Sequence, residues 1–289
     1  MRAAELVVTV AKGILYVVAT PIGNLGDISA RGIEVLRQVD LIAAEDTRHT
    51  RPLLRHLNIR TPMLAMYEHN EAAQLDKLMA CLASGQAIAL VSDAGTPLIS
   101  DPGFPLVREC QRKGIQVSPV PGACAAVAAL SASGLATDRF YFEGFPPRTS
   151  GARQQRFRGL VAESATLVFY ESSHRIRASL TDMATVFGAD RKAVLARELT
   201  KIHETIVSSE LGRLVAALER DADQRKGEFV ILVGGALKNS DDVSPEAVRV
   251  LDILLEALPV KQAASLAARI TGEKKNRLYQ LALNNEVDG

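Results

Sequence analysis

Short apolar runs alternate with stretches of helical periodicity along the first half of the chain. Residues 14–19 (ILYVVA) form an unbroken apolar run, which is typical of a strand buried on both faces. Further strands are expected at residues 41–44, 87–91 and 115–119, and helices at residues 28–38, 53–57, 70–84 and 104–113. This alternation predicts an α/β domain with a mostly parallel sheet covered by helices.

The helix that begins at Asn70 shows the pattern most clearly. Four apolar residues recur at i, i+3, i+4 and i+7 and share one of its faces: Leu75, Leu78, Met79 and Leu82. Asn70 is suited to cap the first turn, and Gly85 follows the last. We interpret the four side chains as core, because an amphipathic helix buries its apolar stripe.

The second half of the chain repeats the alternation. A helix of small residues at 123–132 ends at Gly134 and marks the expected domain boundary. The strands and helices expected after it are the strands 139–143, 166–170, 193–196 and 229–233 and the helices 151–162 and 174–187.

A polar stretch at 236–243 (ALKNSDDV) reads as a linker to a terminal group of helices. Ser244 and Pro245 favour a helix start, and two short helices follow at 261–270 and 274–283. The expected organisation is a flexible extension (1–12), an N-terminal α/β domain (13–122), a second α/β domain (123–236) and a helical module (244–289).

The composition removes several classes of function. The 34 Lys and Arg residues balance 33 Asp and Glu residues, so any attraction for nucleic acid must be local. The three cysteines form no CxxC pair and the five histidines no HExxH motif, so no metal site is expected. Because no apolar stretch approaches the ~18 residues of a membrane helix, we expect a cytoplasmic protein without a membrane segment.

Candidate chemistry concentrates in loops that follow the predicted strands. These loops are residues 20–27 (TPIGNLGD), 44–50 (AEDTRHT), 92–103 (SDAGTPLISDPG) and 121–126 (PGACAA). Ligands bind beyond the carboxyl ends of parallel strands, and a loop as long as 92–103 is usually functional between regular elements. Each loop also has a plain interpretation as a turn or a helix cap.

Two common nucleotide motifs are absent. The chain contains neither GxxxxGK[ST] nor the classical dinucleotide fingerprint GxGxxG with its acidic partner, which argues against NTP and NAD. Loops rich in carbonyls, hydroxyls and a few carboxylates suit a ligand with an adenosine and an amino-acid end but no phosphate.

The chain resembles the ribosomal small-subunit RNA methyltransferase I family, within the tetrapyrrole methylase superfamily, in eight segments between Leu15 and Val233. In order, these segments are TPIGNLGDIS, AEDTRHT, SDAGTPLISDPG, PGACAAVAALSASGL, FEGFPP, FYESSHR, ARELTKIHET and KGEFVILV. Residues 261–283 (KQAASLAARITGEKKNRLYQLAL) resemble the terminal helical module of the same family.

The resemblance implies an activity, a cofactor and partners. The activity would be methylation of the ribose 2′-hydroxyl of a decoding-centre cytidine in 16S rRNA of the small ribosomal subunit, with S-adenosylmethionine (SAM) as donor and no metal. It implies two α/β domains with SAM in the cleft between them, and a homodimer. Carried over by position, the SAM site would comprise Pro21, Gly23, Asp93, Gly95, Thr96, Gly122, Cys124, Ala125, Tyr170 and Leu199. Residues 92–94 (SDA) depart from the Gly-Asp-Pro of many superfamily relatives.

Methyl transfer to a hydroxyl requires positioning, and it benefits from a base or a cation near the developing alkoxide. The segments AEDTRHT and FYESSHR bring suitable groups to strand ends, and we take four residues as catalytic candidates: Asp46, Arg48, Glu171 and Arg175. The alternative is that Glu171 and Arg175 form a structural ion pair.

Two basic clusters offer contacts to RNA phosphates. The first lies within residues 148–158 and the second within 261–277, where Glu273 is the single acid. The RNA candidates are Arg148, Arg153, Lys274, Lys275 and Arg277. A basic helix face is more often simply solvated, but the helix–Thr-Gly–helix setting favours RNA for the second cluster.

Two other functions remain open from the sequence. The first is a small-molecule, tetrapyrrole-type methylase of the same fold, for which the basic clusters have no purpose. The second is a non-enzymatic assembly factor that binds nucleic acid and holds SAM as a structural ligand. The assembly factor would bind SAM without transferring its methyl group, and this distinguishes it from both the RNA methyltransferase and the small-molecule methylase.

Overall fold

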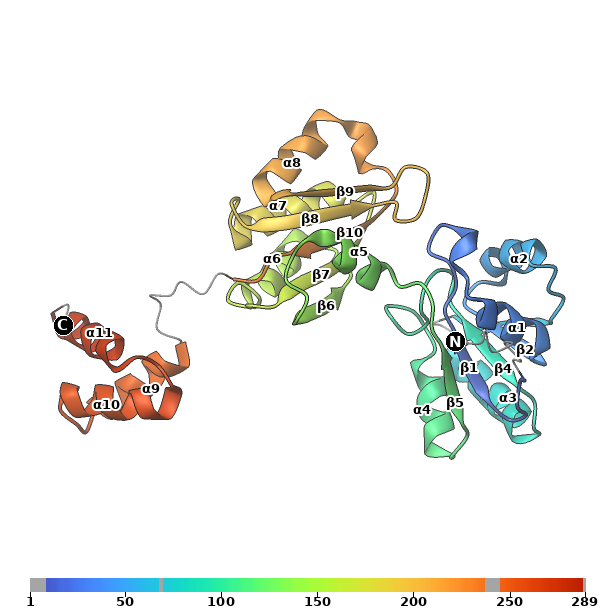
Figure 1. Ribbon diagram of the computed structural model, residues 1–289, viewed down its shortest axis with the longest axis horizontal. Helices are drawn as coiled ribbons and strands as arrows, with labels where there is room; N and C mark the ends of the chain where they lie inside the picture. Colours follow the sequence, from blue (N-terminus) through green and yellow to red (C-terminus); the bar gives the residue numbers. More distant parts are fainter. Residues whose placement is uncertain (1–8, 68–69, 237–244, 288–289) are drawn as a thin grey trace, which may run out of the picture. The chain divides into compact units, whose positions relative to one another are not determined.

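The computed structural model describes residues 9–67, 70–236 and 245–287. Residues Met1–Gly235 form one compact unit and Ala236–Gly289 a second, and each is described by itself (Figure 1). Most of the expected extension 1–12 lies outside the described residues.

The first unit begins with a five-stranded parallel sheet in the order β3-β2-β4-β1-β5. Its strands are β1 (Leu15–Val18), β2 (Leu41–Ala44), β3 (Met63–Ala65), β4 (Ile88–Val91) and β5 (Val117–Val120). Four of the five were expected from apolar runs, and all are parallel as predicted. The three-residue β3 was not expected, because its side chains are only half-buried.

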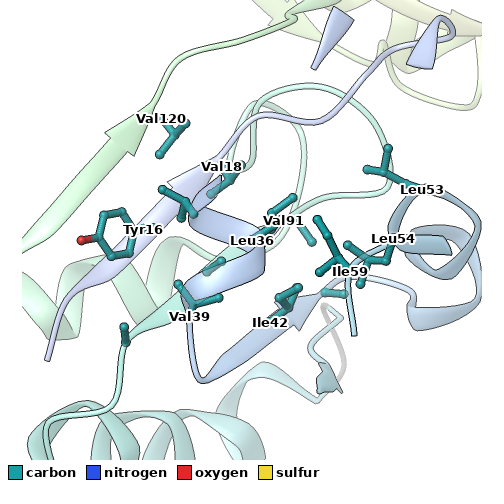
Figure 2. Close-up of a cluster of buried hydrophobic side chains, with 14 of the residues drawn as sticks. Tyr16, Val18, Leu36, Val39, Ile42, Leu53, Leu54, Ile59, Val91 and Val120 are labelled. Atoms are coloured by element: carbon teal, nitrogen blue, oxygen red, sulfur yellow. The ribbon is translucent and has the colours of Figure 1, made fainter. Parts of the chain in front are cut away.

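Helices cover both faces of this sheet. They are α1 (Ala30–Gln38), α2 (Thr47–His56), α3 (Glu71–Ala83) and α4 (Phe104–Arg112), with the 3-10 turn η1 (Leu25–Asp27) before α1. One core lies between the sheet and helices α1 and α2 (Figure 2). Tyr16 and Val18 point into it, whereas Leu15 points into the core beneath α3 and α4. The unbroken apolar run of β1 therefore serves two cores, as a strand buried on both faces requires.

The second sheet, in the order β6-β7-β10-β8-β9, is mixed. Its strands are β6 (Phe140–Gly144), β7 (Thr166–Ser172), β8 (Lys192–Arg197), β9 (Thr205–Glu210) and β10 (Glu228–Val233). Only β6 and β7 pair in parallel; β7–β10, β10–β8 and β8–β9 are antiparallel. The expectation of a repeated β-α alternation is therefore wrong here, because β8 joins β9 with no helix between them.

Helix α5 (Ala125–Ser133) packs on one face of the second sheet. Helices α6 (Ser150–Arg158), α7 (Ile176–Phe187) and α8 (Leu211–Arg220) pack on the other, and the 3-10 turn η2 (Ala222–Arg225) precedes β10. The small side chains of α5 let it lie close to the strands, and Gly134 ends it with φ 70°, a backbone conformation that glycine adopts readily. A domain boundary near residue 122 remains a prediction.

The second unit contains three helices around a small core of alanine and leucine. They are α9 (Pro245–Leu255), α10 (Val260–Thr271) and α11 (Lys275–Val287). Ala263, Ala267 and Leu278 are fully buried, and Gly272 ends α10 with φ 76°. Ile270, near the end of α10, takes little part in this packing, because its side chain is 64% exposed. None of the helices that the structure describes is long and apolar enough to cross a membrane.

Candidate active site

A cleft of about 350 Å³ opens where strand ends of the first sheet meet the second sheet, a size within the usual range for small-molecule sites. Seven of the predicted cofactor residues line it: Asp93, Gly95, Thr96, Cys124, Ala125, Tyr170 and Leu199. The rest of its wall comes mainly from the loop after β4 and from β7 and β10. The structure thus brings together loops that are far apart in the sequence.

The long loop 92–103 is held by backbone bonds to the turn after β1. The Thr20 N–H donates to the Gly95 carbonyl at 2.8 Å, and the Gly95 N–H returns a bond to the Thr20 carbonyl at 3.1 Å. The Thr96 hydroxyl donates to the Ala123 carbonyl at 2.9 Å. Gly95 has φ 86°, and Leu98 and Ser100 also adopt positive φ. Such conformations cluster where a loop is held for function.

Asp93 joins this loop to the start of α2. Its Oδ1 accepts a bond from the Asp46 N–H at 3.0 Å, and its Oδ2 lies 2.7 Å from Nδ1 of His49. The hydrogen bond and the charge of Asp93 raise the pKa of His49 above its ordinary value. Asp93 therefore fixes the position of the AEDTRHT segment relative to the cleft.

We expect Asp93→Asn to lower the pKa of His49 toward its ordinary value near 6.5, because the neutral amide removes the charge that favours the imidazolium. The raised pKa also means that this pair stabilises the fold below about pH 6.5, and that the contribution is lost as the pH rises through the folded-state value. NMR titration of the His49 ring measures the shift. Asp27→Asn, at an exposed position, is the control and should leave the titration unchanged. An identical His49 titration in Asp93→Asn contradicts the assigned contact.

The catalytic candidates Asp46 and Arg48 lie at the edge of this arrangement and do not line the cleft. Asp46 caps α2 by accepting from the Arg48 N–H at 2.8 Å, and it also accepts from the Arg48 guanidinium at 2.6 Å. These hydrogen bonds from Arg48 lower the pKa of Asp46 to about 2. Asp46 is thus a weak base, and Arg48, whose side chain is 86% exposed, faces solvent.

Glu171 and Arg175 form an ion pair inside the second sheet layer. The Glu171 carboxylate is fully buried, lies 3.3 Å from the Arg175 guanidinium and accepts from the Ser179 hydroxyl. Glu171 lines the cleft, but the carboxylate of Glu171 binds Arg175 and Ser179 at the start of α7. This arrangement supports the structural alternative for the pair rather than the catalytic one.

The turn after β1 packs closely against the loop that follows β8. The Asn24 N–H donates to the Thr200 hydroxyl at 3.1 Å, and a Cβ at Gly23 would lie 2.5 Å from Cγ of Lys201. Pro21 is buried, and the next residue, Ile22, lines the cleft. Pro21, Gly23 and Gly122, predicted to bind the cofactor, are absent from the cleft wall. At Gly23 and Gly122 the missing side chain lets neighbouring segments approach closely.

Tyr170 connects β7 to the helix that closes the cleft. Its hydroxyl accepts from the Ala126 N–H at 3.1 Å, and burial raises the pKa of its phenol well above the ordinary value. Its ring meets Phe142 and Phe145 edge-on at 5.0 and 5.7 Å between centroids. Tyr170 therefore stays neutral and gives the cleft an apolar wall.

Several residues of the cleft wall were not among the predicted site residues, and Asp101 is one of the charged ones. Asp101 lines the cleft at the far end of the 92–103 loop, and burial raises the pKa of its carboxyl to about 6. The available signal was the second aspartate in SDAGTPLISDPG, in the same loop as Asp93. Nothing in the sequence distinguished a half-buried carboxylate from one that caps the next helix.

The charged residues that line the cleft are all acidic. Five carboxylate residues contribute to its wall: Glu45, Asp93, Asp101, Glu171 and Glu228. Over the described part of the chain, no Lys, Arg or His side chain does so. Such a wall attracts a cation and repels phosphate groups. No group of His, Cys, Asp or Glu among the described residues is arranged to hold a metal ion.

The basic clusters differ in how much of them is accessible. Arg148 and Arg158 are exposed, but Arg156 pairs with Glu143. The expectation that Arg153 binds RNA is wrong: its side chain is 4% exposed and its guanidinium lies 2.5 Å from Asp182. In the second unit, Lys274 and Lys275 are exposed and Arg277 is half-buried.

Two family profiles together span most of the chain. Tetrapyrrole (Corrin/Porphyrin) Methylases matches residues 14–215, and the RsmI C-terminal HTH domain matches residues 241–286. The Ribosomal RNA small subunit methyltransferase I of Pseudomonas aeruginosa is 53% identical over 276 residues, covering 95% of this chain and 98% of the relative. The chain belongs to the ribosomal RNA small subunit methyltransferase I family. The family predicted from the sequence segments is confirmed.

Other members of the ribosomal RNA small subunit methyltransferase I family are similarly close. The relative from Escherichia coli O157:H7 is 52% identical, with 96% of each chain covered, and that from Synechocystis is 47% identical, with 96% of this chain and all of the relative covered. Among solved structures, cobalt precorrin-4 methyltransferase matches with a TM-score of 0.56 at 16% identity over 77% of this chain and 95% of its own. Diphthine synthase matches with a TM-score of 0.57 at 16% identity over 76% of this chain and 90% of its own. These structures confirm the predicted tetrapyrrole-methylase fold.

Membership in the ribosomal RNA small subunit methyltransferase I family also confirms the interpretation of the chain as a methyltransferase. SAM carries two cationic groups, a sulfonium and an ammonium, together with one carboxylate, and it has no phosphate, so its net charge is +1. The acidic cleft wall suits the two cations, and the apolar surfaces of Ile22, Tyr170 and Leu199 suit an adenosine. The residues present therefore fit this methyl donor.

Proposed function

We propose that this chain transfers a methyl group from SAM to the ribose 2′-hydroxyl of a cytidine in 16S rRNA of the small ribosomal subunit. The observation that carries the proposal is its identity of about half with curated family members over nearly the whole chain, helical module included. The module favours RNA over a tetrapyrrole, which would leave its exposed lysines without a purpose.

SAM would lie against the seven predicted residues that line the cleft, with Pro21, Gly23 and Gly122 supporting the segments behind them. When bound, SAM supplies a methyl group that its positive sulfur has already activated. The chain then has to orient a ribose hydroxyl toward that methyl and exclude water. Asp93 and Thr96 hold the loop that shapes the cleft, and Tyr170 supplies a neutral wall. Asp46 and Arg48 remain candidates for contact with the RNA or the reacting ribose at the cleft edge.

The helical module and Arg148 are the proposed contacts for RNA phosphates. Lys274 and Lys275 lie at the start of α11, and both are exposed. We further propose that the chain acts as a homodimer in the cytoplasm, where small subunits are available. The three free cysteines suit that reducing compartment.

The test is transfer of labelled methyl from SAM. Pure protein is incubated with undermodified small subunits, with naked 16S rRNA and with a tetrapyrrole, and the label is located by nuclease digestion and mass spectrometry. Label on a cytidine ribose supports the proposal. Label on the tetrapyrrole alone supports the small-molecule alternative, and SAM binding without any transfer supports a non-enzymatic assembly factor.

We expect the double reversal Lys274→Glu and Lys275→Glu to weaken binding of small subunits and to flatten its salt dependence. Each phosphate contact that is lost lowers the slope of log affinity against log salt by about 0.7–0.9. Binding isotherms at several salt concentrations measure both effects, and SAM affinity should not change. Lys77→Glu, at an exposed position on α3, is the control. If the double reversal binds with an unchanged slope, these lysines do not contact RNA, and α11 has a structural role.

A further inference from the structure

Helix α2 has a basic outer face opposite the side that it buries. Leu53 and Leu54 pack into the core of the first sheet. Arg48, Arg51 and Arg55 are spaced by three and four residues, so they share one side of the helix, and all three are exposed. The helix sequence, TRHTRPLLRH, contains no Asp or Glu. We call these three arginines the α2 face.

The α2 face differs from a helix surface that only meets solvent. Such a surface usually carries both signs of charge, which pair along the helix; on α1, for example, Arg37 pairs with Glu34. Helix α2 offers no acid of its own for such a pair. Within the described residues, neither Arg51 nor Arg55 forms an ion pair. Two neighbouring guanidinium groups are therefore free to bind an anion.

The first turn of α2 is attached directly to the cleft wall. The N–H of Asp46, the cap residue, donates to Oδ1 of Asp93 at 3.0 Å, and Nδ1 of His49 lies 2.7 Å from its Oδ2. Asp93 itself lines the cleft. The α2 face therefore starts at the edge of the cleft, and Arg55 lies about 10 Å from Arg48 along the helix axis.

The charge of the cleft explains why RNA phosphates need a site outside it. A ribose within an RNA strand carries a phosphate on each side. The charged residues that line the cleft are acidic, and they repel these phosphates. A guanidinium group, by contrast, can donate two parallel hydrogen bonds to a phosphate. The α2 face presents such groups where the strand would leave the cleft.

We propose that the α2 face binds phosphates of the RNA strand beside the target nucleotide and so holds its ribose at the cleft. The proposal rests on the proposed function. It adds a docking surface in the first unit to the basic clusters within residues 148–158 and 261–277, neither of which includes α2. Arg51 and Arg55 contribute binding and orientation, and they take no part in the transfer itself.

The experiment removes two charges from the α2 face. Arg51→Gln combined with Arg55→Gln is compared with the wild-type protein in binding isotherms with undermodified small subunits at several salt concentrations. The double variant should bind at least about tenfold more weakly at low salt. The slope of log affinity against log salt should become shallower by about 1.4–1.8, because two phosphate contacts are lost.

Two further variants separate a local contact from a general effect of charge. Arg213→Gln combined with Arg220→Gln removes two exposed arginines from α8, which packs on the opposite face of the second sheet from α5. This control has the same net charge and should keep the wild-type affinity and slope. Arg51→Lys combined with Arg55→Lys keeps the positive charges and should keep the slope. A slope as shallow as that of the glutamine variant would overturn the proposal.

A kinetic readout separates docking from chemistry. In single-turnover assays, the variant with Gln at positions 51 and 55 should need at least about ten times more small subunits for half-maximal transfer. Its rate at saturating subunits should stay near the wild-type rate. SAM affinity and melting temperature should not change, because both side chains are exposed. A saturated rate that falls as strongly as the affinity would overturn a docking role.

Crosslinking identifies what the α2 face touches. A photo-crosslinking amino acid is placed at Pro52, which is exposed between the two arginines, and the complex with small subunits is irradiated. Crosslinks to 16S rRNA support the proposal, and crosslinks to ribosomal protein alone overturn it. If the wild-type protein binds subunits but transfers no methyl group, the proposed function fails. Wild-type transfer together with normal binding by the glutamine variant overturns this proposal alone.

Discussion

Gly95→Val should lower SAM affinity at least about tenfold while most of the fold survives. Gly95 adopts φ 86°, a conformation that costs an L-residue about 1–2 kcal/mol, and more for a β-branched side chain. The added Cβ would also lie 3.3 Å from Ile22, which lines the cleft. The loop has to shift to relieve both strains, and a loss of 1.4 kcal/mol in binding is a factor of ten. Calorimetric titration with SAM measures it.

Gly114→Val is the matched control for this change. Gly114 has φ 69° and a Cβ there would meet nothing within 4 Å, so the same substitution imposes a similar backbone strain at the end of α4, away from the cleft. Both variants should melt at a lower temperature, but only Gly95→Val should lose SAM affinity. Equal SAM affinities would show that the 92–103 loop does not bind the cofactor.

Arg153→Ala should reduce the free energy of unfolding by about 3–5 kcal/mol, because it leaves the buried Asp182 carboxylate without its partner. Burial alone would raise the pKa of Asp182, but hydrogen bonds from Gln154, Ser150 and Arg153 lower it overall. Because the pKa of Asp182 is lowered in the folded protein, these contacts stabilise the fold at pH values above the ordinary pKa of 3.8. This stabilisation is lost as the pH falls through the folded-state pKa. Urea unfolding at pH 7 and at pH 3 measures the difference.

Arg148→Ala provides the comparison, since Arg148 is exposed and five residues away. It should change stability little and should weaken RNA binding instead. If Arg153→Ala is as stable as Arg148→Ala, then the Arg153–Asp182 pair is not a structural ion pair, and Arg153 returns to the RNA candidates.

Strands β1, β2 and β4 of the first sheet could be predicted because parallel strands buried on both faces leave continuous apolar runs. Strand β9 gave no such run: its residues, TIVSSE, are half-buried or exposed at the edge of the sheet. Helix α8 did carry a signal, with Leu211, Leu214 and Leu218 on one buried face. Because β9 was not recognised, the sequence predicted one long connection between β8 and β10. The antiparallel pairing of β8 with β9 was therefore not expected.

The positions of the site loops were predictable, but the accessibility of their charged groups was not. Arg148 and Arg153 look alike in sequence, yet one is exposed and the other is buried against Asp182, 29 residues further along the chain. Asp93 and Asp101 look equally alike in sequence, and only the fold shows that Asp93 is bound to His49 whereas Asp101 lies half-buried in the cleft wall. Pairing of this kind depends on contacts between distant segments, which periodicity does not encode.

Under the proposed function, the acidic wall of the cleft also bears on how the used cofactor leaves. Methyl transfer turns a positively charged sulfonium into a neutral thioether, so the spent molecule has one positive charge fewer than the donor. The five carboxylate residues of the wall are the same before and after the reaction, and their attraction for the occupant therefore weakens when the methyl group departs. The electrostatics that favour entry of the donor thus also favour its exchange after each turnover, and the demethylated molecule should be a weaker competitor than its size and shape alone would suggest.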